Sequence, residues 1–214
     1  MKIGILWDLD GTLLDTLQDL TDGTNYALRQ YGLPERTPEE VRQFVGNGAR
    51  NLIIRAVEGR ADADAVLDVY RTYYNAHCQD KTGPYPGIPA ALKELETRYP
   101  IAVVSNKPDT SVKILCAQHF PGVYARGESA DCPRKPAPDM LCKAMADIGV
   151  ETCIYVGDSE VDVVTARNAG VPCLSVLWGF RDRAVLSDAG AEYFCETPAD
   201  LVGAIEKIVN EKGW

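Results

Sequence analysis

The chain has 214 residues, of which 46% are hydrophobic and 25% are charged, and its formal net charge is −9. This composition is typical of a globular protein with a sizeable core, and it argues against a disordered chain. The acidic balance disfavours a nucleic-acid partner. No apolar run is long enough for a membrane span or a signal-peptide core, so we expect a cytoplasmic protein without membrane contact.

The first predicted element is a short apolar strand over residues 3–7, which ends at two closely spaced acids, Asp8 and Asp10. Open parallel sheets place their sites at the carboxyl ends of strands, which makes both acids candidate site residues. Two carboxylates this close repel each other unless a cation lies between them, and Mg²⁺ prefers oxygen ligands of this kind. The alternative for an isolated DxDG sequence is a simple turn.

A helical block follows the first strand. Apolar residues recur at helical spacing over residues 17–31, 38–45, 50–57 and 64–78, and no convincing strand interrupts them. Four helices are too many for one crossover connection. We therefore predict a separate helical domain over residues 17–82, inserted into a core made of residues 1–16 and 83–214, with the Pro- and Gly-rich segment 82–89 as the return hinge.

After the hinge, strands and helices alternate. Strands are predicted over residues 101–105, 153–157 and 173–177, with weaker ones at 123–126 and 193–195. Helices are predicted over residues 88–98, 110–119, 139–148, 161–169, 182–189 and 199–211. Alternation of this kind predicts an α/β fold, a Rossmann-like parallel sheet with helices on both faces.

The seven cysteines are odd in number and scattered, and no two of them form a CxxC pair. We expect them to be reduced and mostly buried as small hydrophobic residues. The two histidines, His77 and His119, have no second ligand at metal-binding spacing, so packing or surface roles are expected for them.

Polar residues follow the later strands. Ser105 and Asn106 come at the end of the strand 101–105, where a hydroxyl and backbone N–H groups can hold phosphoryl oxygens. Lys135 precedes Pro136, which restricts the backbone of the lysine and stiffens its base. The alternatives are an N-cap serine and a solvated surface lysine.

Two more acids come after the strand 153–157. Asp158 follows the strand directly and would join Asp8 and Asp10 at the same edge of the sheet, and Asp162 lies one helical turn later. The alternative is that Asp158 or Ser159 caps the helix, which need not exclude metal ligation.

The order of these pieces resembles the haloacid dehalogenase superfamily of phosphatases. Residues 8–12 (DLDGT) resemble its first motif, Ser105 its second, Lys135 its third, and residues 157–159 (GDS) with Asp162 its fourth. The helical block lies where many members carry a helical cap. Residues 44–48 (FVGNG), 104–108 (VSNKP), 134–136 (RKP) and 178–180 (WGF) are further similar to phosphoglycolate phosphatases and their relatives. Trp7 stands where many members have Phe, and we expect this to affect packing only.

The resemblance implies a two-step reaction. Asp8 would attack phosphorus and form an aspartyl phosphate, while Asp10 would protonate the leaving group and then activate water. Mg²⁺ would be held by Asp8, the backbone carbonyl of Asp10 and Asp158. Asp162 would support the ion or Lys135.

The resemblance also implies the residues that bind substrate. Thr12, Ser105, Asn106 and Lys135 would hold the phosphoryl oxygens. The leaving group would be contacted by residues of a cap loop: Gly46, Asn47, Gly48 and Arg50. Among these, Arg50 is the candidate for binding the carboxylate of 2-phosphoglycolate. The expected partner is a small phosphorylated metabolite, and the expected assembly is a monomer or homodimer.

Several alternatives stay open from sequence. The same chemistry could act on pyrophosphate, a sugar phosphate or a nucleotide. A phosphoacceptor signalling domain also gathers acids and a lysine at a sheet edge, but the helical insertion and Asp10, which can activate water, argue against it. A dehalogenase would keep Asp8 as nucleophile without needing Asp10 or Asp158.

Overall fold

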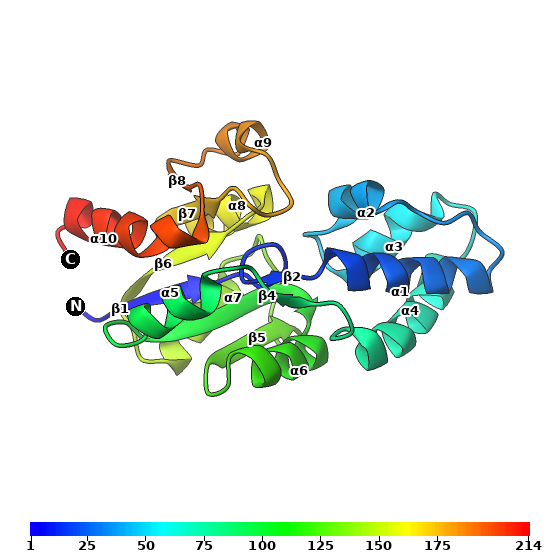
Figure 1. The fold of residues 1–214 in the computed structure, drawn as a ribbon, viewed down its shortest axis with the longest axis horizontal. Helices are drawn as coiled ribbons and strands as arrows, with labels where there is room; N and C mark the ends of the chain where they lie inside the picture. Colours follow the sequence, from blue (N-terminus) through cyan, green and yellow to red (C-terminus); the bar gives the residue numbers. More distant parts are fainter.

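A six-stranded parallel sheet forms the centre of the molecule (Figure 1). The computed structural model describes all 214 residues. The strands, in spatial order, are β5 (Tyr124–Glu128), β4 (Ile101–Pro108), β1 (Ile3–Trp7), β6 (Thr152–Gly157), β7 (Cys173–Val176) and β8 (Tyr193–Cys195). From β1 the chain builds outward on one side through β4 and β5 and then on the other through β6 to β8. The carboxyl end of β1 is therefore the switch point, where open α/β sheets bind ligands.

Helices cover both faces of the sheet, as the alternating pattern predicts. They are α5 (Ile88–Leu95), α6 (Asp109–His119), α7 (Asp139–Asp147), α8 (Glu160–Ala169), α9 (Arg183–Asp188) and α10 (Leu201–Lys212). Successive strand residues point to opposite faces. Ile5 and Trp7 of β1 accordingly belong to the apolar cluster that includes α5, α6 and α10, whereas Leu6 belongs to the one that includes α7, α8 and α9.

Four helices stand beyond the carboxyl edge of the sheet, at the right of Figure 1. They are α1 (Leu17–Gln30), α2 (Pro38–Phe44), α3 (Ala49–Val57) and α4 (Ala63–His77). This helical block was expected as an inserted cap, and the limits 17–82 remain our proposed domain boundaries. None of the helices in the chain has the length and apolar character needed to cross a bilayer.

The two connections between the sheet and the helical block run side by side. Two short strands, β2 (Leu14–Asp15) and β3 (Gly83–Pro84), pair antiparallel there, a pairing too short to predict from residue patterns. Just beyond them, the buried carboxylate of Asp19 accepts hydrogen bonds from the backbone N–H of Lys81 at 3.0 Å and of Thr82 at 2.9 Å, and from the Thr82 hydroxyl at 2.8 Å. The outgoing and returning chains are thus tied together.

Some predicted element ends differ from the structure. β4 continues to Pro108 rather than ending at residue 105, since Pro108 still pairs with Glu128 of β5 beyond an irregularity in the ladder. Helix α5 ends at Leu95 rather than at residue 98, and a short 3₁₀ helix, η1 (Pro198–Asp200), precedes α10. The polar residues of β4 broke the apolar pattern on which the prediction relied. The cysteines are all free thiols and five of the seven are buried, as expected.

Asp19 provides a test of the connection between sheet and helical block. Replacing it in Asp19→Ala leaves buried donors of residues 81 and 82 without an acceptor, and we expect a loss of roughly 1–3 kcal/mol in the free energy of unfolding. Urea denaturation measures this loss. The control is Asp22→Ala, which removes a more exposed partner of Lys81 and should cost less than about 1 kcal/mol. Equal effects of the two substitutions would contradict the role given to Asp19.

Candidate active site

A pocket of about 560 Å³, counted to its mouth, lies between the carboxyl edge of the sheet and the helical block. The sheet contributes polar residues that follow β1 or end β4: Asp8, Asp10, Ser105, Asn106 and Lys107. The helical block contributes mainly small and apolar residues: Val45, Gly46, Gly48, Ala49, Leu52 and Tyr70. The predicted acids thus face a cavity that two parts of the chain close together.

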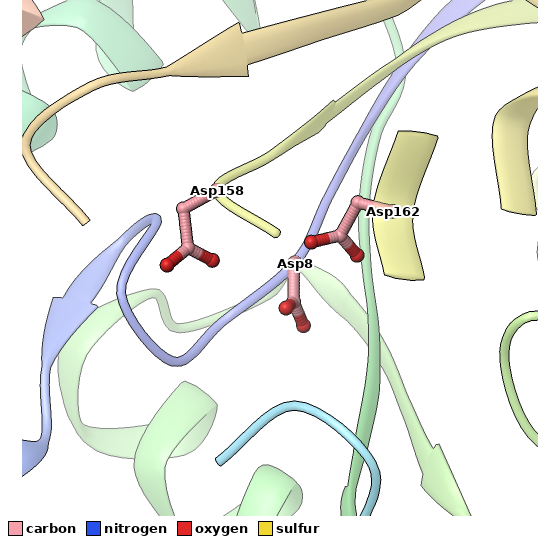
Figure 2. Close-up of side chains that lie close together, drawn as sticks. All are labelled: Asp8, Asp158 and Asp162. Carbon is pink, nitrogen blue, oxygen red and sulfur yellow. The ribbon is translucent and has the colours of Figure 1, made fainter. Parts of the chain in front are cut away.

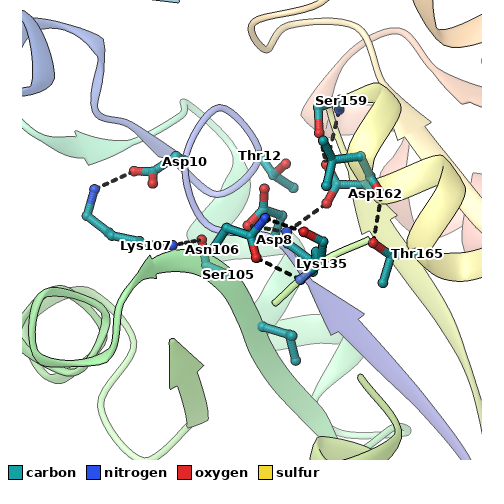
Figure 3. A network of polar contacts seen from close by, with 12 residues as sticks. Asp8, Asp10, Thr12, Ser105, Asn106, Lys107, Lys135, Ser159, Asp162 and Thr165 are labelled. Atoms are coloured by element: carbon teal, nitrogen blue, oxygen red, sulfur yellow. Dashed lines mark hydrogen bonds and ion pairs between the residues drawn. The ribbon is translucent and has the colours of Figure 1, made fainter. Parts of the chain in front are cut away.

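Asp8 lies at the centre of the polar network (Figure 3). The ammonium of buried Lys135 lies 3.0 Å from Asp8 Oδ1 as an ion pair, without the geometry of a hydrogen bond. Burial raises the pKa of Asp8 to about 6, although Lys135 offsets part of the effect. Burial alone would lower the pKa of Lys135, but the carboxylates of Asp162 and Asp8 outweigh it and keep the lysine charged. Tyr155 of β6 completes the surroundings of Lys135 by accepting a hydrogen bond at 2.8 Å.

Asp158 is fixed from several sides. Its carboxylate accepts hydrogen bonds from the Thr12 hydroxyl at 3.2 Å and from the Phe180 backbone N–H at 2.6 Å. Burial, followed by the nearby carboxylates, raises its pKa well above the ordinary value. Gly11, at a φ of 78°, and Gly179 leave the space that Asp158 fills, since a Cβ on either would come within 2.3 Å of this side chain. Thr12, expected to bind phosphate, here holds Asp158.

Asp8, Asp158 and Asp162 form an acidic triad at the ends of β1 and β6 (Figure 2). Each offers a carboxylate oxygen, and these oxygens lie within 4.8 Å of one another. Asp162 has both oxygens engaged: Oδ1 with Lys135 at 2.8 Å, and Oδ2 with the backbone N–H and hydroxyl of Ser159, which caps α8. This agrees with a supporting role for Asp162.

The triad fits a divalent cation. Three ionised carboxylates beside one lysine would leave two negative charges in a buried site, which is costly without a counter-charge. Oδ1 of Asp8 is consistent with this, because it is buried and its one close partner is the Lys135 ammonium, which does not meet hydrogen-bond geometry. Oxygen donors alone are the set that Mg²⁺ prefers. Of the predicted ligands, the structure brings the carboxylates of Asp8 and Asp158 together. The predicted ligand atom of Asp10 is its backbone carbonyl, and its side chain lies outside the triad.

The side chain of Asp10 pairs with Lys107, a residue to which sequence reasoning gave no role. Lys107 Nζ lies 2.8 Å from Asp10 Oδ1, and both side chains are largely buried. The same ammonium lies 4.6 Å from the ring centre of Tyr74, on α4 of the helical block. Asp10 therefore stands at the junction of the two parts, with its charge balanced separately from that of the triad.

Asn106 holds the loop that carries Lys135, and Ser105 lines the pocket beside it. Asn106 accepts a hydrogen bond from the Lys135 backbone N–H at 2.8 Å and donates to the Lys135 carbonyl at 2.9 Å. It also donates to the carbonyl of Gly46 in the helical block at 3.1 Å. Ser105 lines the pocket with its hydroxyl beside the Lys107 backbone N–H, 3.4 Å away. Ser105 thus remains placed to meet phosphate, whereas the amide of Asn106 is occupied by backbone.

The structure brings only part of the predicted leaving-group loop into the pocket. Gly46 and Gly48 line it, but Asn47 turns its carbonyl to the side chain of Asn51. Arg50 lies outside the lining and makes a two-point ion pair with the exposed Asp64, at 2.7 and 3.0 Å. The expectation that Arg50 grips the substrate finds no support in this arrangement.

Arg181 is a second residue that sequence reasoning missed. It is buried and donates to the carbonyls of Arg42 at 2.8 Å and Val45 at 2.7 Å, and its Nε bonds Glu160 at 2.9 Å. In return, Arg42 of α2 donates to the carbonyl of Gly179 at 3.2 Å. These reciprocal bonds hold the α2–α3 connection against the sheet edge. Its only sequence signal was its place beside the WGF segment.

Comparison with known proteins agrees with this geometry. Residues 5–176 match the model of the haloacid dehalogenase-like hydrolase family. The chain belongs to the haloacid dehalogenase-like hydrolase family. The resemblance to this family that was drawn from the motifs is therefore confirmed.

Individual relatives are similar along nearly the whole chain. A phosphoglycolate phosphatase from Aquifex aeolicus is 30% identical over 97% of this chain and 98% of its own. Phosphoglycolate phosphatase 1 from Pseudomonas aeruginosa is 32% identical over 92% of this chain and 78% of its own. A crystal structure from Lactobacillus delbrueckii subsp. bulgaricus, described as a candidate phosphoglycolate phosphatase, is 37% identical with a TM-score of 0.87, over 94% of this chain and 97% of that one.

Arg181 yields a test of the contact between helical block and sheet. Arg181→Gln removes donors to the carbonyls of residues 42 and 45, so we expect faster amide hydrogen exchange across residues 42–48 in the intact chain. Mass spectrometry of exchanged peptides measures it. Arg183→Gln is the control, since Arg183 is exposed and its partners, Glu196 and the ring of Phe194, lie away from the helical block. Unchanged exchange in Arg181→Gln would show that other contacts hold the segment.

Proposed function

We propose that this chain hydrolyses a small phosphomonoester by way of an aspartyl phosphate on Asp8, with 2-phosphoglycolate as the substrate. The observation that carries the proposal is the arrangement around Asp8. It is a buried carboxylate at the switch point of the sheet, paired with Lys135 at 3.0 Å and open to a pocket that also holds Asp10. A nucleophile, a cation for phosphoryl charge and a second carboxylate for proton transfer are together there.

In the first step, a carboxylate oxygen of Asp8 attacks phosphorus and the bond from phosphorus to the ester oxygen breaks. Asp10 enters this step as the neutral acid, whose Oδ1 can still accept the N–H of Lys107, and gives its proton to the departing alkoxide, which leaves as an alcohol. Lys135 offsets charge on the phosphoryl oxygens, and the Ser105 hydroxyl can donate to one of them. Thr12 and Asn106 contribute indirectly, by holding Asp158 and the Lys135 backbone.

In the second step, water attacks phosphorus of the aspartyl phosphate and the bond to Asp8 breaks. Asp10, now a carboxylate, takes a proton from that water, which returns both acids to their starting states. Lys107 holds Asp10 toward the pocket. A carboxylate in this place distinguishes a hydrolase from a signalling domain, in which the phosphorylated state must persist.

Mg²⁺ is the proposed cofactor, held by Asp8 and Asp158 with the Asp10 carbonyl as the further expected ligand. When bound, it would screen Asp8 from the phosphate and stabilise negative charge on the phosphoryl group. Asp162 supports the site indirectly by positioning Lys135, because its oxygens already accept hydrogen bonds from Lys135 and Ser159.

The substrate assignment rests on the enclosure of the pocket by the helical block and on the names of the relatives. The pocket is closed on one side by the helical block, which favours a small metabolite over a protein or nucleic acid. Relatives about 30% identical along the chain are named phosphoglycolate phosphatases. Sugar phosphates, nucleotides and pyrophosphate belong in the same assay as competing substrates.

The acids can be tested separately. Asp8→Asn should abolish phosphate release, since an amide cannot replace the nucleophile, and Asp10→Asn should slow turnover by roughly 10²-fold or more. Phosphate release from 2-phosphoglycolate measures both. Asp15→Asn, at an exposed position two residues before α1, should keep normal activity. Full activity of Asp8→Asn would overturn the proposed mechanism.

Metal binding can be measured without turnover. Titration calorimetry should show that Asp158→Asn weakens Mg²⁺ binding roughly 10-fold or more, while exposed Asp188→Asn leaves it unchanged. Because Asp8 has a pKa of about 6, protonation competes with the ion at low pH. Affinity should therefore fall as the pH drops below about 6. Equal affinity in Asp158→Asn and the unmodified chain would remove Asp158 as a ligand.

A further inference from the structure

Three buried cationic side chains lie at or beside the pocket, and two of them are fully engaged by the protein. Lys135 is shared among Asp8, Asp162 and Tyr155. The guanidinium of Arg181 donates its hydrogen bonds to backbone carbonyls of the helical block and to Glu160. A substrate with a second negative group would find little donor capacity at either residue.

Lys107 is different. Its ammonium has three N–H donors, and the protein supplies one carboxylate oxygen, that of Asp10 at 2.8 Å. Its other close partner is the face of the Tyr74 ring, which attracts a cation without offering a lone-pair acceptor. Lys107 lines the pocket and is only 5% exposed, so an anion binding there would be shielded from water.

The surroundings of Lys107 suit a compact anion. Gly48 and Ala49, at the start of α3, line the same pocket. A Cβ on Gly48 would lie 3.0 Å from the Glu128 carboxylate, 3.2 Å from the Arg134 guanidinium and 3.5 Å from the carbonyl of Asn106. Glu128 and Arg134 form an ion pair at 3.4 Å, so the carboxylate of Glu128 has its own counter-charge. Gly48 brings no side chain to cap the first turn of this nine-residue helix. The positive end of α3 therefore adds to the field of the ammonium.

We infer that Lys107 is the residue that selects substrates with a second anionic group beside the scissile ester, by binding that group with its uncommitted N–H donors. The inference rests on the proposed function, because the leaving oxygen must lie next to Asp10, which protonates it. Lys107 touches Asp10, so a carboxylate one carbon from the ester oxygen falls within its reach. This is the structure of 2-phosphoglycolate, and it gives Lys107 the role that the sequence suggested for Arg50.

The test compares 2-phosphoglycolate with 2-hydroxyethyl phosphate, a substrate of the same length that has a neutral end. The unmodified chain should prefer 2-phosphoglycolate in kcat/KM. Lys107→Gln should reduce this preference roughly 10-fold or more, the scale of a hydrogen bond to a charged group, chiefly through KM for 2-phosphoglycolate. Lys107→Arg should keep most of it. Lys113→Gln, which removes an exposed lysine on α6, is the control and should leave the preference unchanged.

The outcomes distinguish a failure of the role inferred for Lys107 from a failure of the proposed hydrolase function. Equal losses on both substrates in Lys107→Gln would show that the lysine only orients Asp10, and this overturns the inference alone. A lack of preference in the unmodified chain also overturns it, and needs no variant to fold. Failure of the unmodified chain to hydrolyse any phosphomonoester would remove the proposed function and the inference together.

Discussion

Electrostatic balance around one buried lysine governs this site. Asp8, Asp158 and Asp162 meet at the carboxyl ends of β1 and β6, and Lys135 is the one ammonium among them. Carboxylates removed from water in this way must be protonated, paired or bound to a cation. Burial raises the pKa of both Asp8 and Asp158, in keeping with three carboxylates that share a single lysine. A site that is short of positive charge is suited both to a divalent cation and to the charge redistribution of phosphoryl transfer.

Much of the surrounding structure serves to maintain that balance. Asn106 fixes the backbone of Lys135 with two hydrogen bonds. Gly11, which has no side chain, leaves space for the side chain of Asp158. Asp10 and Lys107 form a second ion pair outside the triad. This pair contacts the helical block, because the Lys107 ammonium lies over the ring of Tyr74. The two carboxylates of the DxD sequence thus have different partners, as their different proposed roles in nucleophilic attack and proton transfer require.

The sequence patterns predicted most of the framework but few of the side-chain partnerships. The strand 3–7, the parallel sheet and the meeting of Asp8 with Asp158 follow from local apolar runs and from the rule that parallel strands end at one edge. The ion pair of Lys107 could not be foreseen, because it joins residues 97 positions apart through the tertiary fold. The partner of Arg50 could not be foreseen either. The position of Arg50 after Gly48 predicts a substrate contact, and in the structure its guanidinium pairs with exposed Asp64 near the start of the next helix.

The central claim is that Asp8 becomes phosphorylated during turnover, and trapping the intermediate tests it most directly. Asp10→Asn should slow the attack of water, so rapid acid quenching after mixing with substrate should capture the aspartyl phosphate. Peptide mass spectrometry should then find one added phosphoryl group on the peptide that contains Asp8, and none in the double variant Asp8→Asn, Asp10→Asn. Phosphate release without any such label at early times, or a label on another residue, would contradict the account.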